Sequence, residues 1–269
     1  MKVVFGSVVY KSAEKYLNDF LTSLQKQKES DFSIIIINDD IETKQLNNIF
    51  SNYLIEIECK KKENLTPIQL RVELLKQAKY ENADLLILGD CDDCFSDMRV
   101  NNIISEYKKN NDMAFFYNEI VDMNGRKLMP KLPDIVYGCE DIGEYNFLGM
   151  SNTAVNLNKL DIKFIESLNE YKYDIFDWYF YTRILLLGLK GKKVDDCSTL
   201  YRLHANNMVG IAECNKNNII REIEVKKNHY KILSKYNQYY LEKYYEYQKK
   251  DEIIIEEKNS KYYWWNFTK

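Results

Sequence analysis

The sequence predicts an α/β fold in which a mostly parallel central sheet is flanked by helices and followed by a helical C-terminal extension. Short β-branched runs alternate with amphipathic patterns across residues 1–118, the order expected of strand–helix–strand units. The apolar runs at 34–37 and 85–88 are too short for free helices and end abruptly in polar residues, as buried parallel strands do. Beyond Gly210 the pattern is helical and rich in Tyr and Lys.

The first strand is expected over residues 2–10, where β-branched residues are frequent. Ser12 is a candidate cap for the next helix, whose apolar residues share one face of a 3.6-residue repeat. The second strand covers 32–37 and ends in Asn38-Asp39-Asp40. An edge strand is expected over 54–58.

A helix start is clearly signalled at Thr66. Thr66 is a candidate N-cap, Pro67 occupies the first helical position, and Gln69 completes a capping box. Arg71 shares a face with the apolar residues of this helix and lies near its N-terminus, where the helix dipole disfavours a cation. We therefore expect an anion close to Arg71.

The strand at 85–88, a helix over 100–107 and a strand over 113–117 continue the alternation and indicate a parallel sheet with helices on both faces. Ligands of such sheets bind at the carboxyl ends of the strands. Residues 120–170 are less regular, and loops of this kind often shape a site for a second substrate.

A later helix is expected to have Asp174 as its N-cap, with Asp177 at the third helical position, and to end at Gly188. A short strand over 192–195 follows it. The aromatic residues at 262–267 have two interpretations: they pack back onto the domain, or they form a membrane-interface or dimer contact.

Composition restricts the classes of partner. A net charge of -3 and a pI near 5.7 argue against a nucleic-acid-binding protein and favour a small-molecule partner. No stretch reaches the roughly 20 apolar residues of a transmembrane helix, so we expect at most peripheral contact with the inner face of a membrane.

The cysteines predict a reducing compartment, the cytoplasm, because most of them are scattered and no secretory signal opens the chain. Cys91 and Cys94 alone have the spacing of a redox pair or half a zinc site, but no second pair accompanies them. The six are Cys59, Cys91, Cys94, Cys139, Cys197 and Cys214.

Three carboxylates follow the strand at 85–88, namely Asp90, Asp92 and Asp93. Carboxylates this close repel one another and resist desolvation unless a cation or a dense hydrogen-bond network compensates. Hard divalent ions prefer such oxygen ligands, so a divalent metal that holds a substrate phosphate is the natural occupant. The alternative is a loop stabilised by hydrogen bonds without a metal.

Six segments follow one another along the chain: Val8-Val9-Tyr10, Ile37-Asn38-Asp39-Asp40, the helix with Arg71, Leu88-Gly89-Asp90-Cys91-Asp92-Asp93, Phe176-Asp177-Trp178 and Tyr201-Arg202-Leu203-His204-Ala205-Asn206-Asn207. In this order they resemble glycosyltransferase family 2, whose members have the Rossmann-like GT-A fold. The resemblance covers residues 1–210. It implies a nucleotide-sugar-binding half at 1–118 and an acceptor-binding half at 119–210, with the extension at 211–269 outside it.

The resemblance implies that the nucleotide of the donor contacts the ends of the first two strands. Val8 and Tyr10 would bind the nucleotide, with Tyr10 stacked on the base, and Asp39 would accept a hydrogen bond from the imide N–H of uracil. The alternatives are a surface tyrosine and a solvated turn aspartate.

The same resemblance assigns the diphosphate and metal. Arg71 would meet the pyrophosphate or its neighbouring acids, although a structural salt bridge also explains it. Asp90 would contact the ribose or the metal, and Asp92 would ligate Mn²⁺ or Mg²⁺. Asp93 would contact these ligands and not the ion itself. His204 would complete the metal shell or pair with phosphate.

Inverting transfer also needs a base for the acceptor hydroxyl, and Asp177 is the candidate. The family commonly has Glu-Asp at this point, whereas Phe176 replaces the first acid here. A favourable first-turn carboxylate explains Asp177 without catalysis, and Asp174 is the second candidate base.

The function implied by the resemblance is metal-dependent, inverting transfer of a sugar from a UDP-sugar to the hydroxyl of a glycan or lipid-linked acceptor in cell-surface glycan biosynthesis. One alternative is an inactive nucleotide- or glycan-binding module with the same fold. Another is a nucleotidyltransferase, although the expected Gly-rich phosphate loop is missing from residues 6–11.

Overall fold

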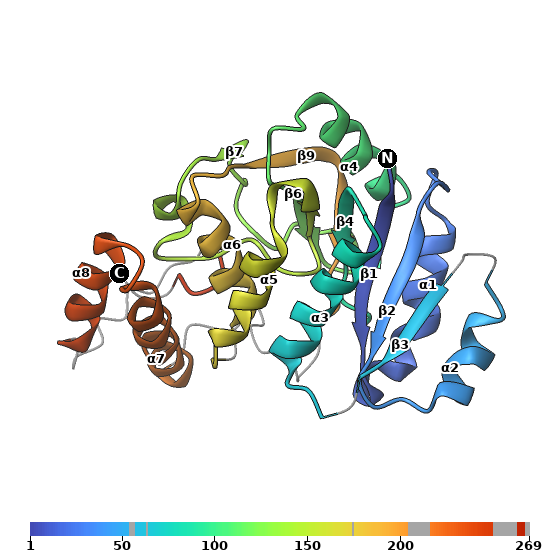
Figure 1. The fold of residues 1–269 in the computed structure, drawn as a ribbon, viewed down its shortest axis with the longest axis horizontal. Helices are drawn as coiled ribbons and strands as arrows, with labels where there is room; N and C mark the ends of the chain where they lie inside the picture. The colour runs from blue at the N-terminus through green and yellow to red at the C-terminus, as the bar shows by residue number, and fades with distance from the viewer. Residues whose placement is uncertain (54–56, 63, 174, 204–215, 250–262, 267–269) are drawn as a thin grey trace.

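The computed structural model describes residues 1–53, 57–62, 64–173, 175–203, 216–249 and 263–266. They form a curled sheet with helices on both faces (Figure 1). The strands are β1 (Val3–Val9), β2 (Ser33–Asn38), β3 (Ile57–Lys61), β4 (Leu85–Leu88), β5 (Cys94–Phe95), β6 (Phe115–Val121), β7 (Ile135–Val136), β8 (Thr153–Asn156) and β9 (Gly191–Leu200). The α-helices are α1 (Leu17–Gln25), α2 (Thr43–Phe50), α3 (Pro67–Tyr80), α4 (Arg99–Lys109), α5 (Ile162–Ser167), α6 (Phe176–Leu186), α7 (Lys216–Leu233) and α8 (Gln238–Gln248).

The sheet has the order β3-β2-β1-β4-β8-β6-β9-β5, and β7 pairs with β9. The pairings among β3, β2, β1 and β4 are parallel, as predicted for the first half of the chain. Helix α4 returns the chain so that β6 runs in the same direction as β4, but β8 lies between them and is antiparallel to both. The sheet is therefore mixed beyond β4, because β8 follows β6 without an intervening α-helix and enters the gap from the opposite end.

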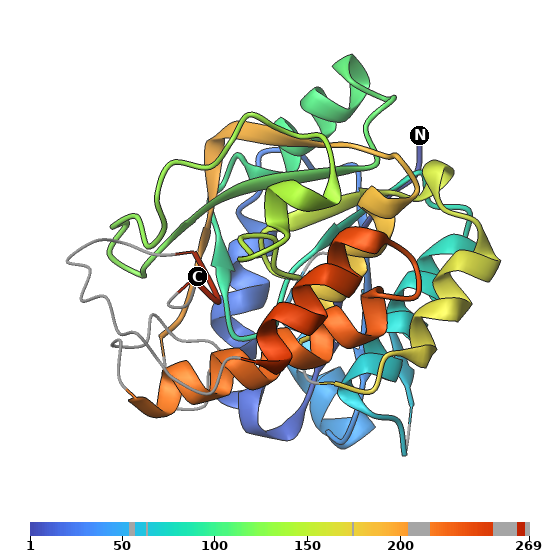
Figure 2. The same cartoon turned by 90° about the vertical axis from the view of Figure 1, so that its left-hand side faces the viewer.

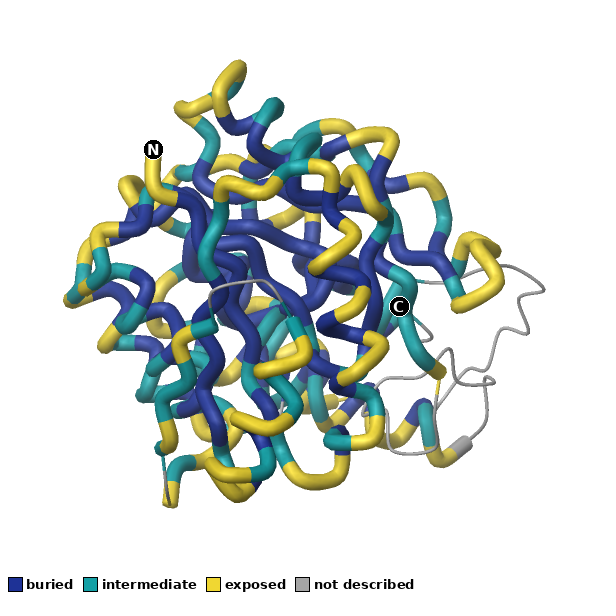
Figure 3. Tube along the Cα trace, turned by 90° about the vertical axis from the view of Figure 1, so that its right-hand side faces the viewer, coloured by how far each residue is buried: buried dark blue, intermediate teal, exposed yellow. Residues whose placement is uncertain are grey.

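Alternation along the strands divides the core into two layers. Val4 of β1 faces the layer covered by α3, α5 and α6, whereas Phe5 faces the layer covered by α1, α2 and α4. On β2, Ile35 faces the same layer as Val4, and Ile34 faces the same layer as Phe5. The buried strands form the centre of the molecule (Figure 3).

Local signals had different outcomes. The capping box at Thr66 is confirmed: Thr66 Oγ1 accepts from the N–H of Gln69, and Gln69 Oε1 accepts from the N–H of Thr66. The Ser12 cap is wrong, because a 3₁₀ helix over Lys11–Tyr16 precedes α1. The 192–195 strand is longer than predicted, as β9 covers Gly191–Leu200.

The start of α6 also differs from the prediction. Ile175 occupies the N-cap position, so Asp177 is the second helical residue and not the third. Asp174 lies outside the described residues, as do residues 54–56 of the predicted edge strand. One edge of the sheet is β3, which pairs only with β2 in the described part of the chain.

Helices α7 and α8 lie in the predicted extension and pack side by side (Figure 2). Their buried residues, such as Ile219, Tyr230 and Tyr240, belong to the same apolar cluster as Trp178 of α6. The boundary near residue 210 stays a prediction. Among the described residues, no helix is both long and apolar enough to cross a membrane.

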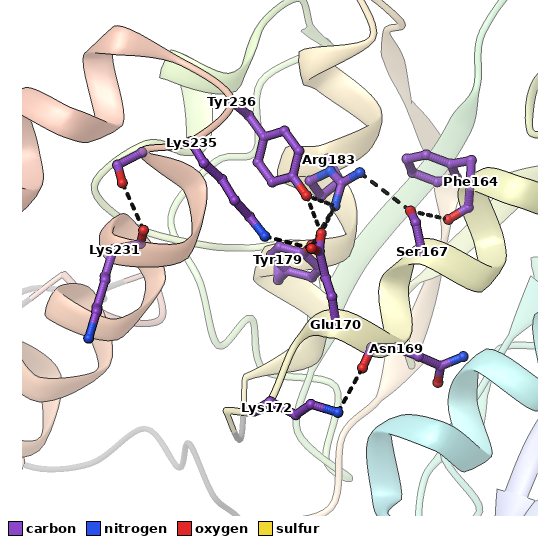
Figure 4. A network of polar contacts seen from close by, with 11 residues as sticks. Phe164, Ser167, Asn169, Glu170, Lys172, Tyr179, Arg183, Lys231, Lys235 and Tyr236 are labelled. Carbon is purple, nitrogen blue, oxygen red and sulfur yellow. Dashed lines mark hydrogen bonds and ion pairs between the residues drawn. The ribbon is translucent and has the colours of Figure 1, made fainter.

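A polar network fastens the turn after α7 to α6 (Figure 4). Glu170 accepts from Lys235 Nζ and from Arg183 Nη1, each at 2.6 Å, and from the hydroxyls of Tyr179 and Tyr236. Burial acts to raise the pKa of Glu170, but the donors from Lys235, Tyr179 and Tyr236 outweigh it and lower the pKa to about 2. Glu170 is therefore ionised at neutral pH and binds the C-terminal helices to the helix that carries Asp177.

Arg99 is a fully buried cation that joins several strands. Its Nη2 atom donates to the carbonyl oxygens of Leu88, Ser151 and Thr153 at 2.9, 3.1 and 3.3 Å. Its Nε atom donates to Asn118 Oδ1 at 2.9 Å. Burial lowers the pKa of Arg99 to about 10, which leaves the guanidinium charged at neutral pH.

His229 of α7 is buried and stacks on Trp178, with ring centroids 4.1 Å apart. Neither imidazole nitrogen has a hydrogen-bond partner among the described residues. Burial, followed by the charge of Lys226, lowers the pKa of His229 to about 3. The native state therefore holds a neutral imidazole, while the unfolded chain binds a proton below about pH 6.5.

Replacement of Arg99 by Met should lower the free energy of unfolding by about 3 kcal/mol, because the carbonyl oxygens at the ends of β4 and β8 lose a charged donor. Urea unfolding followed by circular dichroism measures the change. Arg126→Met is the matched control, since the Arg126 side chain is 78% exposed. Equal unfolding midpoints for Arg99→Met and Arg126→Met would contradict the role of Arg99.

His229→Phe should remove part of the acid sensitivity of the protein. The folded pKa is depressed, so wild-type stability is fully present above about pH 6.5 and declines as the pH falls toward 3. Between pH 6.5 and 5 the wild type should lose about 2 kcal/mol that the variant retains. Thermal unfolding at both pH values tests this, and parallel losses in the two proteins would refute it.

Candidate active site at the carboxyl edge of the parallel strands

A tight turn after β4 presents the carboxylates. A Cβ atom on Gly89 would lie 2.5 Å from Cζ of Phe5 and from Cζ of Phe95, so a side chain does not fit there. The backbone passes between these two rings and leads directly to Asp90 and Asp92. The sheet edge thus receives the acids from a rigid, apolar support.

Asp90 is held by two elements. Its N–H donates to Ser151 Oγ at 3.3 Å, and its Oδ1 lies 3.7 Å from Nη2 of Arg71 in α3. Burial raises the pKa of Asp90, the charge of Arg71 opposes this, and Asp92 adds to the increase. The anion expected near Arg71 is therefore present in the protein itself.

Asp92 lies beside the end of β1. The Tyr10 hydroxyl donates to Asp92 Oδ2 at 3.3 Å. Burial raises the pKa of Tyr10 and the neighbouring Asp92 raises it further, so the phenol remains a neutral donor. Tyr10 and Asp92, which the sequence placed on different strand ends, thus lie in contact.

Asp93 points inward and is 1% exposed. Its Oδ1 accepts from the backbone N–H of Arg202 at 2.9 Å, and its Oδ2 has no partner among the described residues. Burial raises the pKa of Asp93 well above its ordinary value, and the charges of Asp92 and Asp90 add to this. Asp93 is therefore a buried acid behind the partly exposed carboxylates of Asp90 and Asp92.

Arg202 closes this side of the site. Its Nε donates to the carbonyl oxygen of Asp92 at 2.9 Å, and its Nη2 donates to Asp19 at 2.8 Å. The guanidinium also lies 4.6 Å from the ring centroid of Tyr16. Arg202 lies in the sequence segment 201–207 but was assigned no role from the sequence. The available signal was the position of Arg202, two residues before His204.

Asp177 lies in the first turn of α6, where its Oδ1 accepts from the N–H of Trp178 at 2.7 Å. Burial raises the pKa of Asp177 to about 6, against the opposing effects of Arg71 and the Trp178 N–H, while Asp90 contributes to the increase. The fields of Arg71 and Asp90 reach this carboxyl group, so α6 brings Asp177 to the same edge of the sheet.

Tyr201 also belongs to this site, although the sequence assigned it no role. Burial raises the pKa of Tyr201, and the charges of Asp93, Asp90, Asp92 and Asp177 raise it further. The charges of the carboxylates after β4 and of the carboxylate of α6 therefore both act on the Tyr201 phenol. The sequence assigned no role to Ser151 either, because Ser151 and its partner Asp90 are 61 residues apart in the chain.

Asp39 and Val8 lie farther along the same edge. The N–H of Asp39 donates to the carbonyl oxygen of Val9 at 3.0 Å, and Val8 pairs in register with Ile37. Strand β1 lies between β2 and β4, so Asp39 is one strand away from the turn that carries Asp90. Burial, followed by the charge of Asp40, raises the pKa of Asp39.

The proposed metal ligands are only partly described. His204 lies outside the described residues. Within the described ranges, no group of three or more His, Cys, Asp and Glu side chains is arranged to hold a metal ion unaided. Cys91 and Cys94 are buried free thiols, and burial raises the pKa of both, which disfavours the thiolate form that a zinc or redox site requires.

The sequence of residues 7–156, more than half of the chain, matches the family model of glycosyl transferase family 2. No curated protein sequence matches the chain. Among solved structures, the fold is similar to S. aureus TarS 1–349 in complex with UDP-GlcNAc, with a TM-score of 0.65 and 16% identity over 92% of this chain and 72% of the other.

Two further structures are similar. The mannosyltransferase PcManGT from Pyrobaculum calidifontis, in complex with GDP-Man and Mn²⁺, gives a TM-score of 0.60 and 10% identity over 93% of this chain and 69% of its own. GalNAc-T7 with UDP, GalNAc and Mn²⁺ gives a TM-score of 0.60 and 12% identity over 91% of this chain and 49% of its own. The predicted α/β class and GT-A architecture are thereby confirmed. The chain belongs to glycosyl transferase family 2 and is a glycosyltransferase.

Proposed function

We propose that this glycosyltransferase is metal-dependent and inverting, and that it transfers a sugar from a UDP-sugar to a hydroxyl group of a glycan or lipid-linked acceptor. The observation that carries the proposal is the convergence of Arg71, Asp90 and Asp177 at one sheet edge, where the pKa of Asp177 is about 6. Such a carboxylate is ionised near neutral pH and still basic enough to take a proton.

The donor is proposed to bind across the ends of β1, β2 and β4. Tyr10 and Val8 are partly exposed at the end of β1, where the base would lie, and Asp39 supplies an acceptor for an imide N–H. Arg71 would pair with the diphosphate. Bound UDP-GlcNAc in TarS and bound UDP in GalNAc-T7 favour uridine, while GDP-Man in PcManGT is the competing choice.

The donor atoms of this edge fit a hard divalent ion, because Asp92 offers a partly exposed carboxylate and Asp93 adds a buried oxygen without a partner among the described residues. Asp92 would hold Mn²⁺ or Mg²⁺, with Asp90 beside it and His204 as the proposed additional ligand. When bound, the ion supplies Lewis-acid stabilisation of the charge on the departing nucleoside diphosphate. Donor phosphates and water would fill its remaining positions.

Asp177 is proposed to accept the proton of the acceptor hydroxyl as the new glycosidic bond forms. The first turn of α6 fixes the carboxylate, and Arg71 and Trp178 keep its pKa from rising further. We also propose a cytoplasmic enzyme of cell-surface glycan synthesis, because the described cysteines are free thiols, which suits a reducing compartment.

Asp177→Asn should lower kcat/KM by about 10³-fold and leave the Kd for UDP within twofold of wild type, because the amide cannot take a proton. For the wild type, kcat/KM should fall about tenfold per pH unit below 6, since the raised pKa leaves Asp177 protonated there. Release of UDP from a panel of UDP-sugars, with methyl glycosides as acceptors, measures both effects.

Asp112→Asn is the matched control for that experiment. Asp112 is exposed in the turn before β6, at the amino end of that strand, whereas the candidate site lies at the carboxyl ends of β1, β2 and β4. Equal turnover by Asp177→Asn and wild type would remove Asp177 from the mechanism. A wild type that binds UDP yet releases none from any donor would instead indicate a binding module.

Asp92→Ala should abolish the dependence of UDP binding on Mn²⁺. The variant loses the carboxylate proposed to hold the ion, so its Kd for UDP should be the same with Mn²⁺ and with EDTA, whereas the wild type should bind at least tenfold more weakly in EDTA. Isothermal calorimetry provides the values. A variant that still gains affinity from Mn²⁺ would show that Asp92 is not the ligand.

A further inference from the structure

Residues 263–266, here called the aromatic strap, lie against a loop more than a hundred residues earlier in the chain. The N–H of Asn146 donates to the carbonyl oxygen of Trp264 at 2.9 Å, in an antiparallel bridge. The ring of Tyr263 stacks on Tyr145, with centroids 4.9 Å apart and an interplanar angle of 20°. The strap therefore has a defined place, and the interpretation that it packs back onto the domain is confirmed for these residues.

Trp264 lies next to the loop that supports the carboxylates. A Cβ atom on Gly149 would lie 2.8 Å from Cη2 of Trp264, so the indole rests directly on the Gly149 backbone. Two residues later, Ser151 accepts the hydrogen bond from the Asp90 N–H. Trp264 is thus separated from the turn after β4 by one short loop.

The other neighbour of Trp264 is Tyr201, at a centroid distance of 6.4 Å. The residue after Tyr201, Arg202, donates its backbone N–H to Asp93 at 2.9 Å, so the indole lies beside a segment that contacts the carboxylate turn. A sugar ring bound at this edge of the sheet would therefore meet the indole.

Trp264 differs from the other two tryptophans, all three of which the structure describes. Trp178 is fully buried and Trp265 is 6% exposed, as expected for core residues, whereas Trp264 keeps part of its surface open. A partly exposed indole beside a polar site offers a flat apolar face with low conformational cost to a ligand.

An open groove continues from the strap on the side of Tyr263, with Pro133 and Tyr145 in its lining. Its lining carries two lysines and two aspartates, namely Lys131, Lys193, Asp134 and Asp195. Lys193 lies 2.8 Å from Asp195, and Lys192, beside the groove, lies 2.8 Å from Asp134. A groove with equal numbers of positive and negative side chains favours a neutral ligand over an anionic one.

We propose that Trp264 forms an acceptor subsite, in which the indole stacks on the apolar face of a sugar ring and the groove beside Tyr263 receives the rest of a neutral oligosaccharide. This inference rests on the proposed transfer to a glycan hydroxyl and assigns the substrate class that binds there. It gives the aromatic strap a role in selecting the acceptor and none in holding the donor.

The test uses the full chain with UDP and Mn²⁺ on an array of neutral and acidic oligosaccharides, followed by calorimetry with the best ligand. Trp264→Ala should weaken glycan binding at least tenfold, Trp264→Phe about threefold, and the Kd for UDP should stay within twofold. Gly149→Ala, which displaces the indole, should weaken glycan binding in the same way. Tyr245→Ala is the control, because Tyr245 is 59% exposed on α8.

Several results would overturn the subsite. These are unchanged glycan affinity in Trp264→Ala, a parallel loss of UDP affinity in that variant, preference of the wild type for acidic glycans, and no glycan bound by a wild type that binds UDP. The array is also repeated without nucleotide, which separates the two proposals. A protein that binds neutral glycans through Trp264 but does not bind UDP would refute the proposed donor and still support the acceptor subsite.

Discussion

The charged hydrogen bonds of Arg99 are the constraint on which the rest of the structure depends. One guanidinium binds carbonyl oxygens at the end of β4 and around the start of β8, and it also binds Asn118 of β6. Asn118 sits at a register shift between β6 and β9, and its amide donates to Thr199 of β9. Four strands are therefore locked together immediately beneath the turn that carries Asp90. Because a buried cation without these partners costs several kcal/mol, the strands cannot shift independently, and the position of the carboxylates is set by the core rather than by the loop itself.

Burial acts against ionisation of several carboxyl groups of the site. Burial raises the pKa of Asp90, Asp93 and Asp177, and Arg71 is the cation whose charge opposes this at Asp90 and Asp177. Arg202 contributes a backbone N–H to Asp93 and directs its guanidinium to Asp19 and to a carbonyl oxygen. Burial and the neighbouring acids thus act against ionisation of Asp90 and Asp93. This crowding of carboxyl groups supports the proposed divalent ion better than the spacing of Asp90 and Asp92 does.

Sequence patterns predicted the features that depend on neighbouring residues. The capping box at Thr66, the parallel strands β1, β2 and β4, and the anion near Arg71 all follow from local propensity, alternation and the helix dipole. The insertion of β8 did not follow, because an apolar strand reads the same in either direction. Ser151, Tyr201 and Arg202 escaped notice because their partners are distant in sequence, as at 61 residues for Ser151 and up to 183 for Arg202, and are in part backbone atoms. The start of α6 was misplaced because Asp177 bonds to the next residue instead of completing a cap.

Residues that lie in contact at the site are far apart in the chain and are therefore synthesised at different times. Strands β1, β2 and β4 are synthesised before the acidic turn and pair with one another in parallel, whereas the bond between Arg202 and Asp19 joins residues 183 positions apart. Tyr201, Arg202 and Trp264 are synthesised more than a hundred residues after the acidic turn. During that interval the nascent chain has exposed carboxylates but lacks the segments that cover them. A truncated product that ends before β9 therefore retains these carboxylates without the segments that shield them from water.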